Sequence, residues 1–166
     1  MKIDELYTDL APKVTNYLVA NGTPYHAACD IVQETFLKVW KMRDTLQEDM
    51  HAISGLIYTI ARNLRTDALR HGKFIVYEAE LRDEDVQEPD PSPSDAAYLR
   101  SRIREAFNQL PPLLRDTYAL FQIAELPIRE IARLTNVSES LVKVRIFRAK
   151  GRLRLLLKDL AGMANG

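Results

Sequence analysis

Apolar residues recur at helical spacing along the first part of the chain. The first stretch begins at Ile3 and stops at Asn21–Gly22. Thr23 and Pro24 then predict an N-cap, with proline at the first helical position of a second helix that runs to about Met42. The apolar stripe of this second helix is expected to contain Ala28, Ile31, Val32, Phe36, Val39 and Trp40.

A polar break from Arg43 to His51 precedes a third helix, whose apolar stripe begins at Ile53. This helix is expected to end near His71–Gly72, because glycine is a natural C-cap. Residues 76–97 have no periodicity and combine acidic side chains with several prolines. That composition predicts a flexible, extended linker, either a solvated tether or a segment that occupies a basic channel.

Helical spacing returns over residues 98–162. The pair Pro111–Pro112 would break a helix, so one helix is expected to end near Leu110 and another to start there. A short helix is expected from Ile128 to Thr135, and Ser138 is expected to cap a long final helix. Asn136 lies between them and tolerates the left-handed backbone of a tight turn. These features predict a helix-turn-helix near the C-terminus.

The patterns together predict an all-α protein of two small helical domains, residues 1–75 and 98–166, joined by the acidic linker 76–97. Of the 166 residues, 46% are hydrophobic, which is enough for a sizeable core. No apolar run approaches the roughly 18 residues of a membrane span, and the start of the chain lacks the features of a secretory signal. The single cysteine and three scattered histidines offer neither a disulfide framework nor metal-ligand spacing. We therefore expect a cytoplasmic protein without membrane insertion, metal or cofactor.

The net charge of zero conceals a strong asymmetry along the chain. Residues 76–101 carry two basic and eight acidic side chains, a net charge of −6, whereas residues 102–166 carry twelve basic and six acidic ones, a net charge of +6. In the final helix, no acid interrupts the run from Ser140 to Leu157, which contains six Lys and Arg residues outside the apolar stripe. Cations crowded around one helix repel each other, so a polyanion such as DNA is the better explanation of this segment.

Three segments resemble a known family. The segment from Asp30 to Trp40 resembles region 2.2 of bacterial sigma-70-family factors, and that from Ile57 to Leu64 resembles their regions 2.3 and 2.4. Glu130–Ala132, together with Val142–Lys143 and Arg145–Lys150, resembles region 4.2. The order, the spacing and the short linker are similar to the extracytoplasmic-function group, which keeps only regions 2 and 4.

The resemblance implies a factor that binds core RNA polymerase, directs it to promoters and assists melting of the duplex, with an anti-sigma factor as a further partner and no small-molecule substrate. It implies three sets of contact residues. Core polymerase would contact Asp30, Gln33, Glu34 and Lys38; the minus-ten element would contact Arg62, Asn63, Arg65, Thr66 and Arg70; and the minus-thirty-five element would contact Ser138, Ser140, Leu141, Lys143, Val144, Arg145, Phe147 and Arg148. The break from Arg43 to His51 would be the loop that captures a flipped base.

The residues themselves limit these assignments. Asp30, Gln33 and Glu34 share one helix face, but a plain solvated face would look the same. Arg62 and Arg65 lie off the apolar stripe of their helix, so we expect them to be free to meet DNA. Leu141 and Val144 stand where family members usually have threonine and serine, so the promoter sequence is not implied.

Other functional classes are distinguished by what they predict. A conventional repressor or activator would bind specific DNA without polymerase, and a sigma-like adaptor that engages only a regulator would support no promoter-dependent transcription. An enzyme is disfavoured, because the sequence shows no nucleophile–base pair, glycine-rich phosphate loop or metal cluster.

Overall fold

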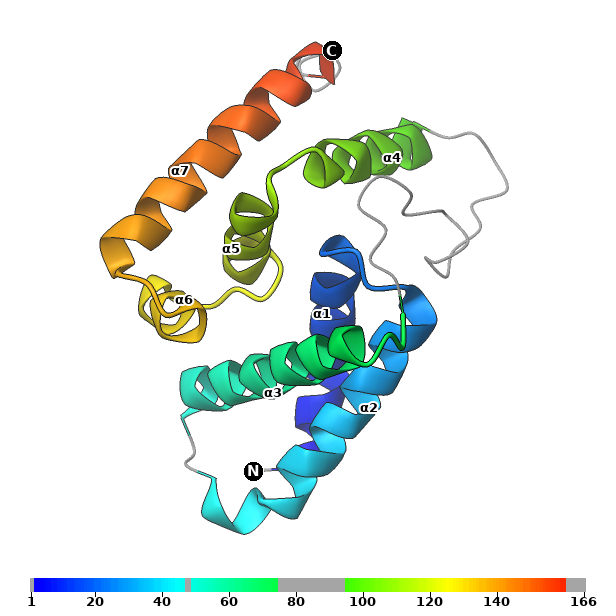
Figure 1. Cartoon of the computed structure of the whole chain (residues 1–166), viewed down its shortest axis with the longest axis vertical. Coiled ribbons are helices and arrows are strands. Elements are labelled where there is room, and N and C mark those ends of the chain that lie inside the picture. The colour runs from blue at the N-terminus through cyan, green and yellow to red at the C-terminus, as the bar shows by residue number, and fades with distance from the viewer. Residues whose placement is uncertain (1, 47–48, 75–94, 161–166) are drawn as a thin grey trace.

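The protein is all-helical over the residues that the computed structural model describes, 2–46, 49–74 and 95–160. No strand occurs within these ranges, which confirms the predicted all-α class. Figure 1 shows two groups of helices, α1 to α3 and α4 to α7, that lie against each other. We call them the N-terminal domain (2–74) and the C-terminal domain (95–160).

The N-terminal domain contains three long helices, α1 (Ile3–Ala20), α2 (Tyr25–Lys41) and α3 (Met50–Arg70), with a 3-10 turn η1 (Arg43–Thr45) after α2. The helix ends follow the predicted signals, because Gly22 and Gly72 adopt positive φ angles of 93° and 67° directly after Asn21 and His71, the C-caps of α1 and α3. Pro12 lies inside α1, on its exposed side.

The predicted start of α2 was wrong by one residue. Pro24, and not Thr23, is the N-cap, and no side chain caps the helix. Thr23 is fully buried, and its Oγ1 accepts a hydrogen bond of 2.8 Å from Arg65 Nε in α3. The threonine hydroxyl therefore serves a tertiary contact instead of a helix cap.

A second correction concerns Trp40, which was expected on the buried stripe of α2. Its side chain is 48% exposed, and the Arg43 guanidinium stacks over its ring at 3.9 Å from the centroid. The rest of the stripe is buried as predicted, including Ile31, Phe36 and Val39. Trp40 thus lies at the edge of the core, next to the turn that follows the helix.

The C-terminal domain contains four helices, α4 (Asp95–Asn108), α5 (Pro112–Gln122), α6 (Ile128–Thr135) and α7 (Glu139–Leu156), and ends in a 3-10 turn η3 (Lys158–Leu160). The predicted break at Pro111–Pro112 is confirmed, since α4 ends before it and α5 begins at Pro112. Helix α4 begins at Asp95, so residues 95–97 of the predicted extended linker are helical instead. Residues 76–94 of that linker lie outside the described residues.

One hydrophobic core runs through both domains. It joins buried residues of α1 to α3, such as Val14, Phe36 and Ile57, to residues of the C-terminal domain, such as Leu120 and Ile131. A smaller cluster of Leu110, Leu114 and Ala149 lies within the C-terminal domain. In the part of the chain that is described, no helix combines the length and apolar character needed to cross a membrane.

Candidate functional site

The outer face of α2 carries the four residues assigned to polymerase contact. Asp30, Gln33, Glu34 and Lys38 are all exposed, while Ile31, Val32, Thr35 and Phe36 on the opposite side are buried. Leu37 and Trp40 are also exposed, at 52% and 48%. The sequence did not single out these two as surface residues, because apolar residues near a stripe are read as core. The face therefore combines charged and apolar side chains.

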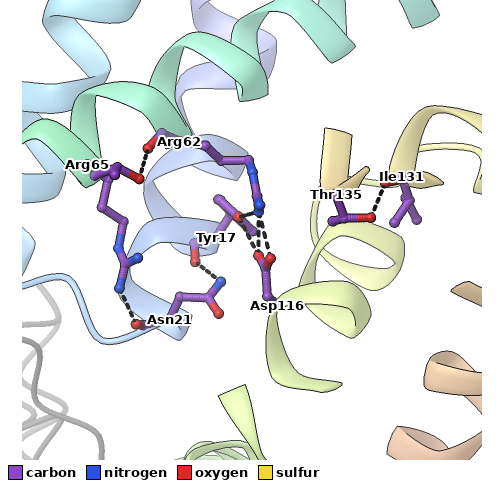
Figure 2. Close-up of polar contacts among 8 residues, drawn as sticks. Tyr17, Asn21, Arg62, Arg65, Asp116, Ile131 and Thr135 are labelled. Atoms are coloured by element: carbon purple, nitrogen blue, oxygen red, sulfur yellow. Dashed lines mark hydrogen bonds and ion pairs between the residues drawn. The ribbon is translucent and has the colours of Figure 1, made fainter. Parts of the chain in front are cut away.

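Arg62 of α3 is not free. Its Nη1 donates hydrogen bonds of 2.7 Å to both carboxylate oxygens of Asp116 in α5 and one of 2.6 Å to the Tyr17 hydroxyl (Figure 2). The Tyr17 hydroxyl in turn donates to Asp116 Oδ1 at 2.5 Å. Three residues from α1, α3 and α5 thus form one closed network, which we call the Tyr17–Arg62–Asp116 network.

This network is partly buried, which strengthens the attraction between its charged groups. The Arg62 and Asp116 side chains are only 26% and 24% exposed. Burial, together with the nearby Asp116 carboxylate, raises the pKa of the Tyr17 hydroxyl well above its ordinary value, so the hydroxyl stays a donor at neutral pH. Burial lowers the pKa of the Arg62 guanidinium, but Tyr17 and Asp116 outweigh it and leave that pKa raised.

Arg65 is engaged within the N-terminal domain. Its Nε donates to Thr23 Oγ1 at 2.8 Å. Its Nη2 donates to the Asn21 carbonyl oxygen at 2.9 Å (Figure 2). These hydrogen bonds connect the end of α1 and the start of α2 to α3. The prediction that Arg62 and Arg65 are free was therefore wrong, because partners distant in the sequence occupy both guanidinium groups.

Three other candidates for minus-ten contact remain on the surface. Asn63, Thr66 and Arg70 are exposed on α3, and Arg70 lies 3.8 Å from Asp67 in a loose ion pair. Of the predicted base-capture loop, Arg43 to Thr45 form the turn η1, residues 47 and 48 lie outside the described part, and Met50 and His51 begin α3. The loop is thus shorter than the sequence suggested.

Helices α6 and α7 form the predicted helix-turn-helix. Asn136 adopts the left-handed conformation, with φ 56° and ψ 46°, directly after α6. Ser138 is the N-cap of α7, and its Oγ accepts a hydrogen bond of 3.1 Å from the Leu141 amide. Ile131, Val142 and Ile146 are buried between the helices, as the motif requires. The left-handed turn at Asn136, the cap by Ser138 and the small apolar core are all confirmed.

The outer face of α7 combines cations with apolar side chains. Lys143 and Arg148 are exposed, and Arg145 is half-buried. Phe147 is 79% exposed, and Leu141 and Val144 are also on the surface. Ser140 is exposed beside them. The eight candidate minus-thirty-five residues therefore lie along the first half of α7 and its N-cap, where a recognition helix presents its side chains.

The sequence missed the residues that join the two domains. Tyr17 and Asp116 are 99 positions apart, and Lys13 pairs with Glu125 at 3.0 Å across 112 positions. No local pattern marks such pairs, since each residue looks like part of an ordinary helix. Within the described ranges, no group of three or more His, Cys, Asp or Glu residues could hold a metal ion.

Comparisons with known proteins agree with the division of the chain. The family model described as Sigma-70 region 2 matches residues 6–74, and that described as Sigma-70, region 4 matches residues 100–153. The RNA polymerase sigma factor CarQ of Myxococcus xanthus is 32% identical over 163 residues, which cover 95% of this chain and 90% of CarQ. The ECF RNA polymerase sigma factor SigM of Bacillus subtilis (strain 168) is 27% identical over 157 residues, 94% of this chain and 95% of SigM.

Two solved structures share the fold over nearly the whole chain. The sigma factor RpoE in complex with the anti-sigma factor NepR, from Bartonella quintana, has a TM-score of 0.69 at 20% identity and covers 93% of this chain and 96% of that one. CnrH in complex with the cytosolic domain of CnrY has a TM-score of 0.64 at 21% identity, covering 95% and 88%. The fold described above is therefore one that experimental structures also contain.

Proposed function

The chain belongs to the sigma-70 family, in its extracytoplasmic-function group, and from that premise we propose that it binds core RNA polymerase and directs it to specific promoters. The observation that carries the proposal is that two suitable surfaces occur on one chain. The first is the exposed face of α2, and the second is the cationic outer face of α7 in a helix-turn-helix.

The proposed roles follow the chemistry of each surface. Asp30, Gln33, Glu34 and Lys38 contact core polymerase, with Leu37 and Trp40 adding apolar area. On α3, Asn63, Thr66 and Arg70 contact the minus-ten element and help to open the duplex. Arg62 and Arg65 join them where DNA displaces the hydrogen bonds that they make to Asp116, Thr23 and Asn21 in the free chain. The first turns of α7 enter the major groove of the minus-thirty-five element, where Lys143 and Arg148 contact phosphates and Leu141 and Val144 meet base edges.

The proposal also concerns partners and location. We infer that an anti-sigma factor regulates the chain, because one structural relative is held in such a complex. The protein acts in the cytoplasm, where RNA polymerase transcribes DNA. It performs no reaction of its own, and the chemistry of RNA synthesis belongs to the polymerase.

The test is transcription of a genomic library with purified core polymerase, with and without this protein. We expect a small set of transcripts that start at related promoters only when the chain is present. Transcripts that do not change on its addition would contradict the proposal. Specific DNA binding that needs no polymerase would instead favour a conventional repressor or activator.

A further inference from the structure

A groove with a volume of about 980 Å³ lies between the two domains. Residues of α4, α5 and α7 line it from the C-terminal domain, and the end of α1 with the start of α2 lines it from the N-terminal domain. None of the residues assigned above to polymerase or to DNA belongs to this lining. Sites for small molecules are concave, often lie between domains and have volumes of about 300–1,000 Å³. The groove therefore has the size and the position of a ligand site.

The walls of the groove are mainly apolar. Leu99 and Ile103 line it along α4, and Leu153 and Leu157 line it along the end of α7. Leu99 and Ile103 are 41% and 45% exposed, although apolar side chains gain free energy when they are covered. Asn108 Oδ1 in the same lining is buried and accepts no hydrogen bond from any described residue. The walls are therefore suited to a hydrocarbon chain, with one acceptor available to a hydroxyl or an amide N–H.

The rim of the groove is positively charged. Lys150, Arg154 and Lys158 are exposed and line the groove at intervals of four residues along α7 and η3. Arg100 and Arg104 line it from α4, and no described lining residue is an aspartate or a glutamate. Cations gathered at a cleft with apolar walls attract an anion, and the aliphatic stems of Lys and Arg extend the apolar surface. The charge of the rim thus favours a negatively charged ligand.

Arg102 holds the two long walls together. Its Nη1 lies 2.6 Å from Asp159 Oδ2, and its Nη2 donates a hydrogen bond of 3.3 Å to the Leu156 carbonyl oxygen. These contacts connect α4 to the end of α7. A ligand therefore meets walls that are already in place, which reduces the free energy spent on ordering the site when it binds.

We propose that this groove binds an amphiphile that combines a hydrocarbon chain with an anionic headgroup. The chain packs between the apolar walls, and a carboxylate or a phosphate contacts the cations of the rim. The proposal goes beyond the proposed function and does not depend on it, because the groove shares no residue with the assigned polymerase and DNA contacts. Since Val19 and Ala20 of α1 also line the groove, a bound ligand contacts both domains and stabilises the folded chain.

The test compares ligands of one chain length by isothermal titration calorimetry of the full chain. The anions are dodecanoate and dodecyl phosphate, the control for the headgroup is dodecyltrimethylammonium, and the control for the hydrocarbon chain is acetate. Each amphiphile is used below its critical micelle concentration. We expect saturable binding at a single site for one or both anions and none for the two controls, and the tighter anion identifies the headgroup. At about a hundredfold excess over its Kd, this anion should raise the melting temperature by roughly 5 °C or more.

Two pairs of variants locate the site. Arg154→Glu reverses a cation of the rim, and its matched control is Arg152→Glu, which changes an exposed arginine of α7 outside the lining. Ile103→Gln makes one wall polar, and its matched control is Leu155→Gln, at a residue that is 75% exposed and also outside the lining. We expect each groove variant to weaken binding of the tighter anion on the order of tenfold and each control to change it less than about twofold. All four positions are on the surface, and circular dichroism checks that the variants fold.

Absence of saturable binding of both anions to the wild type would overturn the proposal. Equally tight binding of dodecyltrimethylammonium would overturn it too, since the hydrocarbon chain alone would then account for binding. An equal loss of affinity in Arg152→Glu and Arg154→Glu would show that overall charge, and not the groove, is the cause. A synthetic acidic amphipathic peptide that binds the wild type but not Arg154→Glu, where neither anion binds, would identify a protein-docking surface instead.

Discussion

At the residue scale, Asn136 determines the geometry of the helix-turn-helix. Its left-handed backbone places Ser138 where it caps α7. A side chain with a Cβ costs about 1 kcal/mol or more in this conformation, and asparagine relieves part of that cost by local hydrogen bonding. Glycine adopts the conformation without strain.

We therefore expect Asn136→Ala to lower the free energy of unfolding by about 1 kcal/mol, and Asn136→Gly to leave it unchanged or to raise it. Urea denaturation followed by circular dichroism measures both. Equal loss in the two variants would show that the asparagine side chain, and not the backbone angle, is what the turn requires.

Leu141 and Val144 are apolar residues on the surface that faces DNA in the proposed complex. Both are exposed, and apolar side chains in the major groove contact thymine methyl groups. The variants Leu141→Thr and Val144→Ser should alter preference at A·T positions of the minus-thirty-five element, by about 1 kcal/mol per site. Competition binding against a randomised element measures this preference.

Lys143→Ala is the comparison for these two variants, because Lys143 is exposed on the same helix. It should weaken binding to all sequences and lower the slope of log K against log salt by about one. A base preference identical in wild type and the Leu141/Val144 double variant would instead indicate a protein partner for this apolar face.

At the element scale, helical periodicity predicted most of the structure. The helices of both domains follow apolar stripes whose phase also correctly placed Asp30, Gln33 and Glu34 on one exposed face. Periodicity could not predict that Trp40 stays at the surface, because an apolar residue at a stripe edge satisfies the same pattern. Nor could it predict that the Thr23 hydroxyl accepts a hydrogen bond from Arg65 in another helix.

The α2 face gives a prediction that belongs to the element as a whole. Replacement of Asp30, Gln33 and Glu34 by alanine should weaken binding to core polymerase, while the free energy of unfolding changes by less than about 0.5 kcal/mol per site. Glu5 and Asp9 are exposed acids on α1, so their alanine variant is the matched control. Unchanged co-purification of the triple variant with core polymerase would contradict the role of the face.

At the scale of the whole molecule, the two-domain division followed from the sequence but the contact between the domains did not. Asp116 and Arg62 are 54 positions apart, and neither residue carries a local signal that it meets the other. The sequence thus identified Arg62 as a candidate for DNA binding without revealing that the fold already gives it a partner. Long-range pairs of this kind become visible only in three dimensions.

The packing of the two domains against each other also predicts how a regulator acts. An anti-sigma factor that inhibits the chain should cover two faces at once, that of α2 near residues 30–34 and that of α7 near residues 140–154. Both faces are exposed while the domains pack against each other. Hydrogen exchange of the inhibited complex should show added protection in both segments. Protection confined to one domain would contradict this expectation.

The hydrophobic core that runs through both domains has a thermal consequence. Separation of the domains exposes part of that core to water, so opening carries a positive heat-capacity change. Hydrophobic attraction weakens on cooling, whereas the ionic contact at Asp116 does not depend on it. The balance between packed and separated domains is therefore expected to shift toward separation on cooling below the temperature at which their packing is most stable.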